Sequence, residues 1–121
     1  TTFGGNPLAM TAANAVLDVM TAPGFLAGVD DVAERLWTAL RKVAADHPKI
    51  IADVRGAGLM IGLECVVENV VLRAKLHDLG LLTVGAADNV IRLLPPLIID
   101  QSHVDEATEI LTRACQELEG A

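Results

Sequence analysis

The sequence is poor in aromatic residues and in positive charge. Aromatic side chains make up only 2% of the 121 residues, and tyrosine is absent. The core must therefore be built from Leu, Val, Ile and Ala side chains. Nine Lys and Arg residues against 16 Asp and Glu residues give a net charge of −7 at pH 7. Because nucleic-acid binding requires a basic face, this charge argues against a nucleic-acid partner, and no basic cluster indicates a membrane surface.

Cysteine is scarce as well. Cys65 and Cys115 lie far apart, form no CxxC pair and share no metal-ligand spacing with His47, His77 or His103. We therefore predict two reduced, buried thiols of a cytoplasmic protein, and no metal site. The three histidines stand beside polar residues and are expected to be exposed. Nucleophile and zinc motifs such as Gly-x-Ser-x-Gly and His-Glu-x-x-His are missing.

No apolar run is long enough to cross a bilayer, although apolar residues make up 52% of the chain. That share exceeds the need of a small free-standing domain, so some apolar surface is expected to pack against a partner. The chain begins with Thr1 instead of Met, from which we predict that the natural N-terminus, with any targeting signal, lies upstream.

The first predicted helix runs from Pro7 to about Met20. Asn6 can cap it and Pro7 suits its first position. The segment is rich in Ala and apolar on several sides, so we expect it to be well buried. The break at residues 21–24 follows it.

The remaining pattern alternates helices and strands. Helices are predicted over 25–46 and 70–79, with Gly80 as a left-handed cap, and a last helix begins near Ser102, where Ser102 and Asp105 have capping-box spacing. Strands are predicted over 50–55, 59–67, 81–84 and 90–94. This order predicts an α+β fold, a small and mainly antiparallel sheet with helices on one face. We divide the chain into a linker helix over 1–22, from a preceding domain, and a small domain over 23–121.

Two segments are candidates for binding anions. Thr1, Thr2 and two glycines precede a helix N-terminus, where hydroxyls and backbone amides bind phosphate; the alternative is a plain turn. Arg92 stands in the hydrophobic segment 90–97 and needs a partner, such as a substrate carboxylate. The alternatives for Arg92 are a structural salt bridge or a surface arginine. The Gly56-Ala57-Gly58 link beside Arg55 lies between two strands, so we reject a dinucleotide loop there.

Four strings, taken together, resemble one family. Residues 1–9 resemble the (S/T)-T-(F/Y)-G-G-N-P-L-A signature of the class III aminotransferases, the ornithine and acetylornithine group. Residues 54–63 resemble the family's V-R-G-x-G-L-M-x-G-L stretch, and residues 79–82 and 89–99 match later segments in order. The resemblance covers nearly the whole chain, and four ordered matches are far more specific than any one.

The resemblance implies a fold-type I enzyme that depends on pyridoxal phosphate and works as a cytoplasmic homodimer, with active sites at the subunit interface. This chain would be its C-terminal portion, the small α/β domain and the helix leading into it. The implied reaction, closest to the acetylornithine type, moves an amino group between N-acetylornithine and 2-oxoglutarate in arginine biosynthesis. Other class III donors are ornithine, succinylornithine and 4-aminobutyrate. Two other kinds of function are possible for this chain: a non-catalytic α+β module that binds an amino acid, and a dimerisation fragment.

The resemblance also implies residue roles. Thr2 would bind the cofactor phosphate of the neighbouring subunit, with Thr1 beside it, and Arg92 would bind the substrate α-carboxylate. The Schiff-base lysine of the family lies upstream of the threonine signature, and Lys42, Lys49 and Lys75 do not match it. We therefore expect the missing domain to hold most of the cofactor contacts, and this chain to contain no catalytic residue and to be inactive alone.

Overall fold

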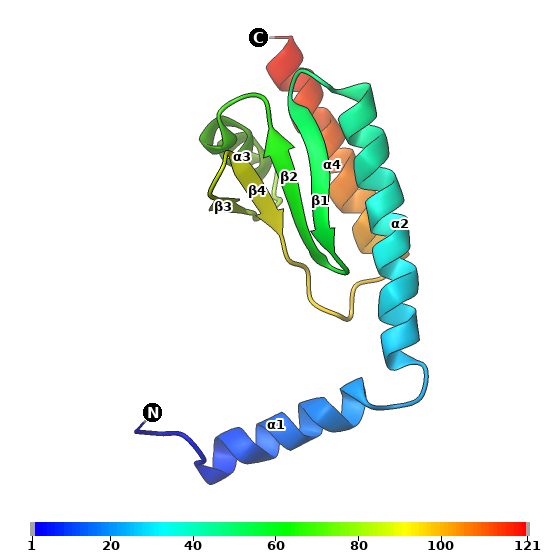
Figure 1. Ribbon diagram of the computed structural model, residues 1–121, viewed down its shortest axis with the longest axis vertical. Coiled ribbons are helices and arrows are strands. Elements are labelled where there is room, and N and C mark those ends of the chain that lie inside the picture. The colour runs from blue at the N-terminus through cyan, green and yellow to red at the C-terminus, as the bar shows by residue number, and fades with distance from the viewer. Residues whose placement is uncertain (1, 121) are drawn as a thin grey trace.

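A computed structural model describes residues 2–120 as a helical arm followed by an α+β body (Figure 1). The elements in chain order are α1 Pro7–Met20, α2 Phe25–Asp46, β1 Ile51–Ala57, β2 Met60–Cys65, α3 Asn69–Asp78, β3 Val84–Ala86, β4 Val90–Leu93 and α4 Gln101–Glu119. The succession of helices and strands and the α+β class are confirmed.

The four strands form one antiparallel sheet in the order β1-β2-β4-β3. The β1–β2 hairpin requires glycine at its turn, because Gly56 has φ +138° and a Cβ there would overlap the Met60 carbonyl oxygen. Trp37 of α2 holds this turn in place, since its Nε1 donates to the Gly58 carbonyl oxygen at 2.8 Å.

Strand β3 begins three residues later than the predicted 81–84. The Leu81 N–H donates to the Leu76 carbonyl oxygen at 2.8 Å, and Gly80 takes φ +96°. These residues therefore close the end of α3 in the manner of a glycine cap, as predicted for Gly80, and the ladder starts only at Val84.

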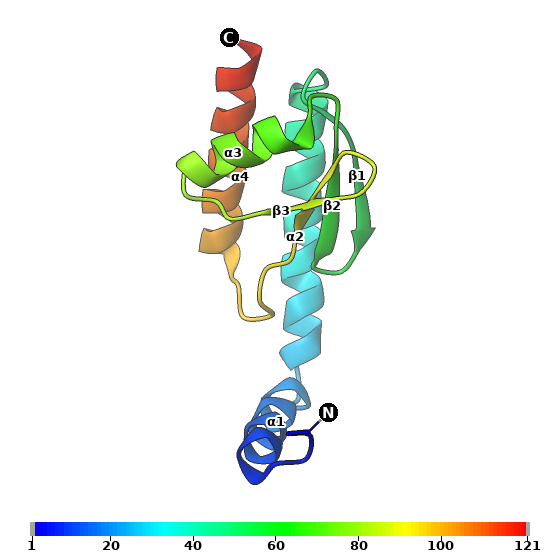
Figure 2. The same ribbon diagram turned by 90° about the vertical axis from the view of Figure 1, so that its left-hand side faces the viewer.

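The core lies between the sheet and the helices on one of its faces, as predicted (Figures 1 and 2). On β2, Leu63 and Ile61 are 0% exposed, and so is Ile91 on β4. The helices supply the other side of the core, chiefly through Leu36, Leu40, Leu72, Leu76, Val104, Leu111 and Ala114. Met60 and Gly62 alternate with the buried residues and face away from them.

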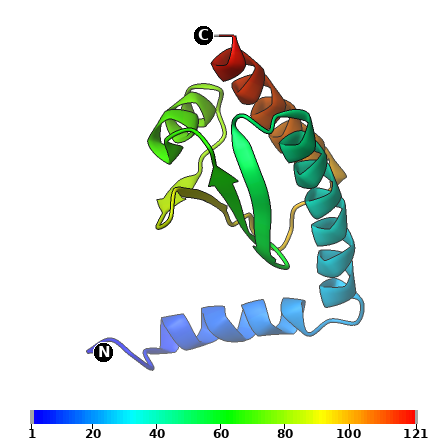
Figure 3. The ribbon, with the colours of Figure 1, turned by 45° about the horizontal axis from the view of Figure 1, so that its top comes forward.

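The predicted burial of the first helix is wrong within this chain. No residue of α1 is buried, and Leu8 is 81% exposed. The turn at residues 21–24 joins α1 to α2, and α1 runs crosswise to α2, below the body and apart from the sheet (Figure 3). Its apolar sides therefore pack against nothing in the described part of the chain, and the division at residue 22 stays a prediction.

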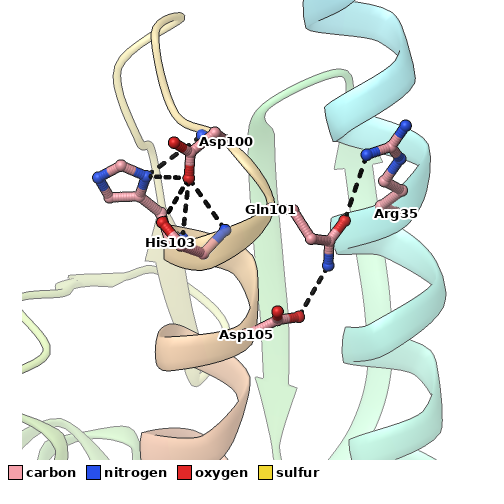
Figure 4. Close-up of polar contacts among 6 residues, drawn as sticks. Arg35, Asp100, Gln101, His103 and Asp105 are labelled. Carbon is pink, nitrogen blue, oxygen red and sulfur yellow. Dashed lines mark hydrogen bonds and ion pairs between the residues drawn. The ribbon is translucent and has the colours of Figure 1, made fainter.

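The N-terminal caps differ from the prediction at one helix. Asn6 caps α1 as expected, accepting from the Ala9 N–H at 2.9 Å. At α4, Asp100 is the cap, and its carboxylate accepts from the Ser102 N–H at 2.9 Å and the His103 N–H at 3.3 Å (Figure 4). The predicted Ser102–Asp105 box is wrong because Asp100 already satisfies these amides.

Figure 4 also shows what the first turn of α4 does with its other polar groups. Asp105 accepts from the Gln101 side-chain amide at 2.7 Å, and that amide's oxygen accepts from Arg35 of α2 at 3.4 Å. Hydrogen bonds from Ser102 and then from His103 lower the pKa of Asp100 to about 2.

Both cysteines are buried free thiols, as predicted. Burial raises the pKa of Cys65, and it raises the pKa of Cys115 to about 12. The prediction for His47 is wrong: this residue is 7% exposed, and its Nδ1 lies 2.9 Å from a Glu119 carboxylate oxygen. His47 ends α2 where the end of α4 covers it, and no local pattern in the sequence shows that contact.

Within residues 2–120, no single helix is both long enough and apolar enough to cross a membrane; α1 and α2 pass that test only together, as a pair bent by 72°. Over the same residues, no three His, Cys, Asp or Glu side chains gather as ligands for a metal ion.

Candidate functional site

The face of the sheet opposite the helices carries a row of paired residues. Arg55 of β1 pairs with Gly62 of β2, Gly62 pairs with Arg92 of β4, and Arg92 pairs with Val84 of β3. Directly paired residues lie on the same face of a sheet, so the two arginines flank Gly62 on one surface. We call this surface, with Met60 beside the row, the open face.

A hollow of 530 Å³ on the open face is lined by both arginines and Gly62. Its other lining residues are mostly apolar, namely Gly56, Ala57, Met60, Ile61, Ala86 and Val90. On this face Met60 is 58% exposed and Val84 is 52% exposed. The open face thus combines exposed apolar side chains with two guanidinium groups, a composition suited to a binding surface.

Neither Arg55 nor Arg92 forms an ion pair or a side-chain hydrogen bond within the described residues, where five ion pairs lie elsewhere. Asp53 and Glu64 form an acidic cross-strand pair near this row, and the Asp53 carboxylate accepts from the Val54 N–H at 2.8 Å. The structural salt bridge considered for Arg92 is therefore absent from this part of the chain. Arg92 is exposed and free to bind an anion.

The second candidate site is the turn before α1. Thr2 is exposed, Gly5 has φ +77°, and the Asn6 side chain donates to the Phe3 carbonyl oxygen at 2.7 Å. The first turn of α1 carries no acidic residue, so nothing there neutralises the positive end of the helix dipole. These features suit a phosphate group. Thr1 lies outside the described residues.

The structure does not bring Thr2 and Arg92 together within one chain. The N-terminal turn lies at the outer end of α1, and the two perpendicular views show it well apart from β4 (Figures 1 and 2). The two candidates therefore lie on two separate surfaces of this chain.

Two lysines already have acidic partners. Lys42 pairs with Asp46 at 3.2 Å, and Lys75 pairs with Glu117 at 3.1 Å. Arg113 and then Lys75 lower the pKa of Glu117 through their hydrogen bonds. Neither lysine lines the hollow on the open face.

Sequence reasoning missed the place of Arg55 in the row. The glycine link after Arg55 indicated the hairpin, and the hairpin register alone places Arg55 opposite Gly62. The pairing of β2 with β4, which brings Arg92 to the other side of Gly62, joins segments that are distant in sequence and carries no local signal.

Comparison with known proteins places these surfaces in context. The model of the family described as aminotransferase class-III matches residues 1–115. An acetylornithine aminotransferase of Bradyrhizobium diazoefficiens is 49% identical over 94% of this chain and 28% of its own length. This chain thus spans about 28% of the length of that relative.

Solved structures agree with the fold. The crystal structure of N-acetylornithine aminotransferase from Stenotrophomonas maltophilia superposes with a TM-score of 0.87 at 26% identity, over 97% of this chain and 33% of its own. An ornithine aminotransferase of Plasmodium yoelii superposes with a TM-score of 0.85 at 32% identity, over 97% and 32%. The small antiparallel sheet and its helices are therefore an arrangement found in such enzymes.

Proposed function

This chain belongs to the class III aminotransferase family, and on that premise we propose that the full-length protein transfers an amino group between N-acetylornithine and 2-oxoglutarate. The similarity to acetylornithine aminotransferases supports this choice of donor. Pyridoxal phosphate is the proposed cofactor, and when bound it supplies the electron sink for the chemistry. This chain would contribute binding surfaces to the site.

The observation that carries the proposal is Arg92, an arginine without an acidic partner on a largely apolar face. In 2-oxoglutarate a carboxylate lies next to the reacting carbon, whereas N-acetylornithine, whose α-amine is acetylated, reacts at its terminal amine. A guanidinium group binds a carboxylate through two parallel hydrogen bonds, which fixes both position and orientation. Arg92 would therefore hold the substrate in place, and would take no part in proton transfer.

The turn before α1 fits the cofactor's phosphate. Thr2 offers a hydroxyl, and the helix end beside it offers positive charge with no acid in the first turn. Thr1 would lie next to it. The distance between this turn and the open face in one chain supports a homodimer, in which Thr2 of one subunit and Arg92 of the other serve the same site.

We also propose that the lysine of the reaction lies outside this chain. The chain has three lysines, Lys42, Lys49 and Lys75, and none of them lines the hollow on the open face. The isolated chain would accordingly have no aminotransferase activity. Cytoplasmic arginine biosynthesis is the proposed setting, which the two reduced, buried thiols support.

Steady-state kinetics of the full-length enzyme test the choice of donor. We expect kcat/KM with N-acetylornithine to exceed the values for ornithine, succinylornithine and 4-aminobutyrate, with 2-oxoglutarate as acceptor. Ornithine is the second candidate, because the Plasmodium yoelii ornithine aminotransferase shares both fold and 32% identity. A clear preference for ornithine would replace the proposed donor, and no activity with any of the four would refute the proposed reaction class.

A further inference from the structure

We propose that Arg55 and Arg92 close on one carboxylate group from opposite sides, above Gly62, so that Arg55 is a second substrate-binding residue. The inference rests on the proposed function, because it takes the anion to be the substrate carboxylate. It adds to that site a second guanidinium group, on the other side of Gly62 from Arg92.

The register places the three residues correctly for this arrangement. Adjacent strands lie about 4.8 Å apart, so the backbones of Arg55 and Arg92 are roughly 10 Å apart with Gly62 midway. The Arg55 side chain already runs beside Gly62, since its Cγ lies 3.7 Å from the position that a Cβ on Gly62 would take. All three residues line the same hollow. A small planar anion above Gly62 is therefore within reach of both arginines.

Gly62 is needed for space. Its backbone does not take the left-handed conformation that favours glycine. A Cβ there would lie 3.0 Å from Val90 Cγ1 and 3.7 Å from Arg55 Cγ. Any side chain would thus stand between the two arginines, in the place that the carboxylate would occupy.

Electrostatics favour an anion at this point. Two positive groups share one surface, and no described residue neutralises either of them through an ion pair. The exposed side chain of Met60 lines the same hollow, and the exposed Val84 pairs directly with Arg92. Once water is excluded from such a surface, two unpaired cations repel each other more strongly, and a carboxylate between them removes the penalty.

Kinetics of the full-length holoenzyme test the role of Arg55. In Arg55→Met and Arg55→Gln, we expect the KM for 2-oxoglutarate to rise about tenfold to a hundredfold, as expected for loss of a charge-assisted hydrogen bond, with a smaller change in kcat. Arg55→Lys should recover part of the loss, because it restores the charge without the planar fork. Gly62→Ala should also raise KM.

Arg73→Met is the matched control. Arg73 lies on α3, on the helix side, and its guanidinium group sits beside Gly85 without an ion pair in the described residues. Its replacement removes one positive charge from another surface and should leave KM within about twofold, a change too small to count as a lost contact.

The Arg92→Met enzyme separates the two claims. If Arg92→Met raises KM and Arg55→Gln leaves it unchanged, the two-arginine arrangement is refuted and the proposed function stands. If neither variant changes KM, the open face is not the carboxylate site at all. Should Arg55→Met fail to fold, the glutamine and lysine variants decide: unchanged KM in Arg55→Gln refutes the inference, and a rise that lysine partly reverses supports it.

Discussion

On the helix-covered face of the sheet, Ile61, Leu63 and Ile91 are 0% exposed, whereas the opposite face presents Arg55 and Arg92 to solvent. The same strands build both faces, because side chains alternate along a strand. The covered face buries apolar area and holds the fold together. The open face buries little and keeps charged groups without partners. The fold thus depends on one side of the sheet, and the proposed binding surface is the other side.

Neighbouring residues of β4 offer the sharpest test of this contrast. Ile91→Ala should destabilise the chain by about 2–5 kcal/mol, because it leaves a cavity in the core. Arg92→Ala should change the free energy of unfolding by only about 0.5 kcal/mol, because it removes an exposed side chain. Urea unfolding followed by circular dichroism measures both. Equal losses in the two variants would mean that the open face also holds the fold together.

A smaller, pH-dependent effect is expected at the cap of α4, outside both faces. Ser102 and His103 hold the pKa of Asp100 at about 2, below its usual value of 3.8, so the charged cap is favoured in the folded chain. A carboxyl group whose pKa is lower in the folded than in the unfolded chain stabilises the fold at pH values above its unfolded pKa. This stabilisation is lost as the pH falls through the folded pKa. The stabilisation should therefore be complete above about pH 4 and mostly lost near pH 2.

The urea midpoints of the wild type and Asp100→Ala measure this effect. Their difference should be larger at pH 5 than at pH 2. A difference that does not change between the two pH values would show that the charge of Asp100 adds nothing to its hydrogen bonds.

Local sequence patterns predicted what depends on neighbours in the chain. The pattern predicted a helix over 25–46, where α2 lies, and Gly80 as the left-handed cap that follows α3. These patterns failed where burial depends on contacts between residues that are far apart in the sequence. α1 was predicted to be buried because it is apolar, yet nothing in the described chain covers it.

Two polar residues show the same limit. His47 was predicted to be exposed from its neighbours in sequence, yet the end of α4 covers it, at 2.9 Å from Glu119. Asp100 was overlooked as a cap because Ser102 and Asp105, two residues further on, have the same three-residue spacing as Asp100 and His103. For the candidate site, Arg92 and Thr2 could be named from the sequence, but the row through Gly62 to Arg55 depends on the β2–β4 register.

Substitution of Arg92 by methionine in the full-length enzyme tests the central claim most directly. If the open face binds the substrate carboxylate, the KM for 2-oxoglutarate should rise by about a hundredfold, while the melting temperature stays nearly unchanged. Unchanged KM values in a folded, cofactor-loaded Arg92→Met enzyme would contradict the assignment of the open face to substrate binding.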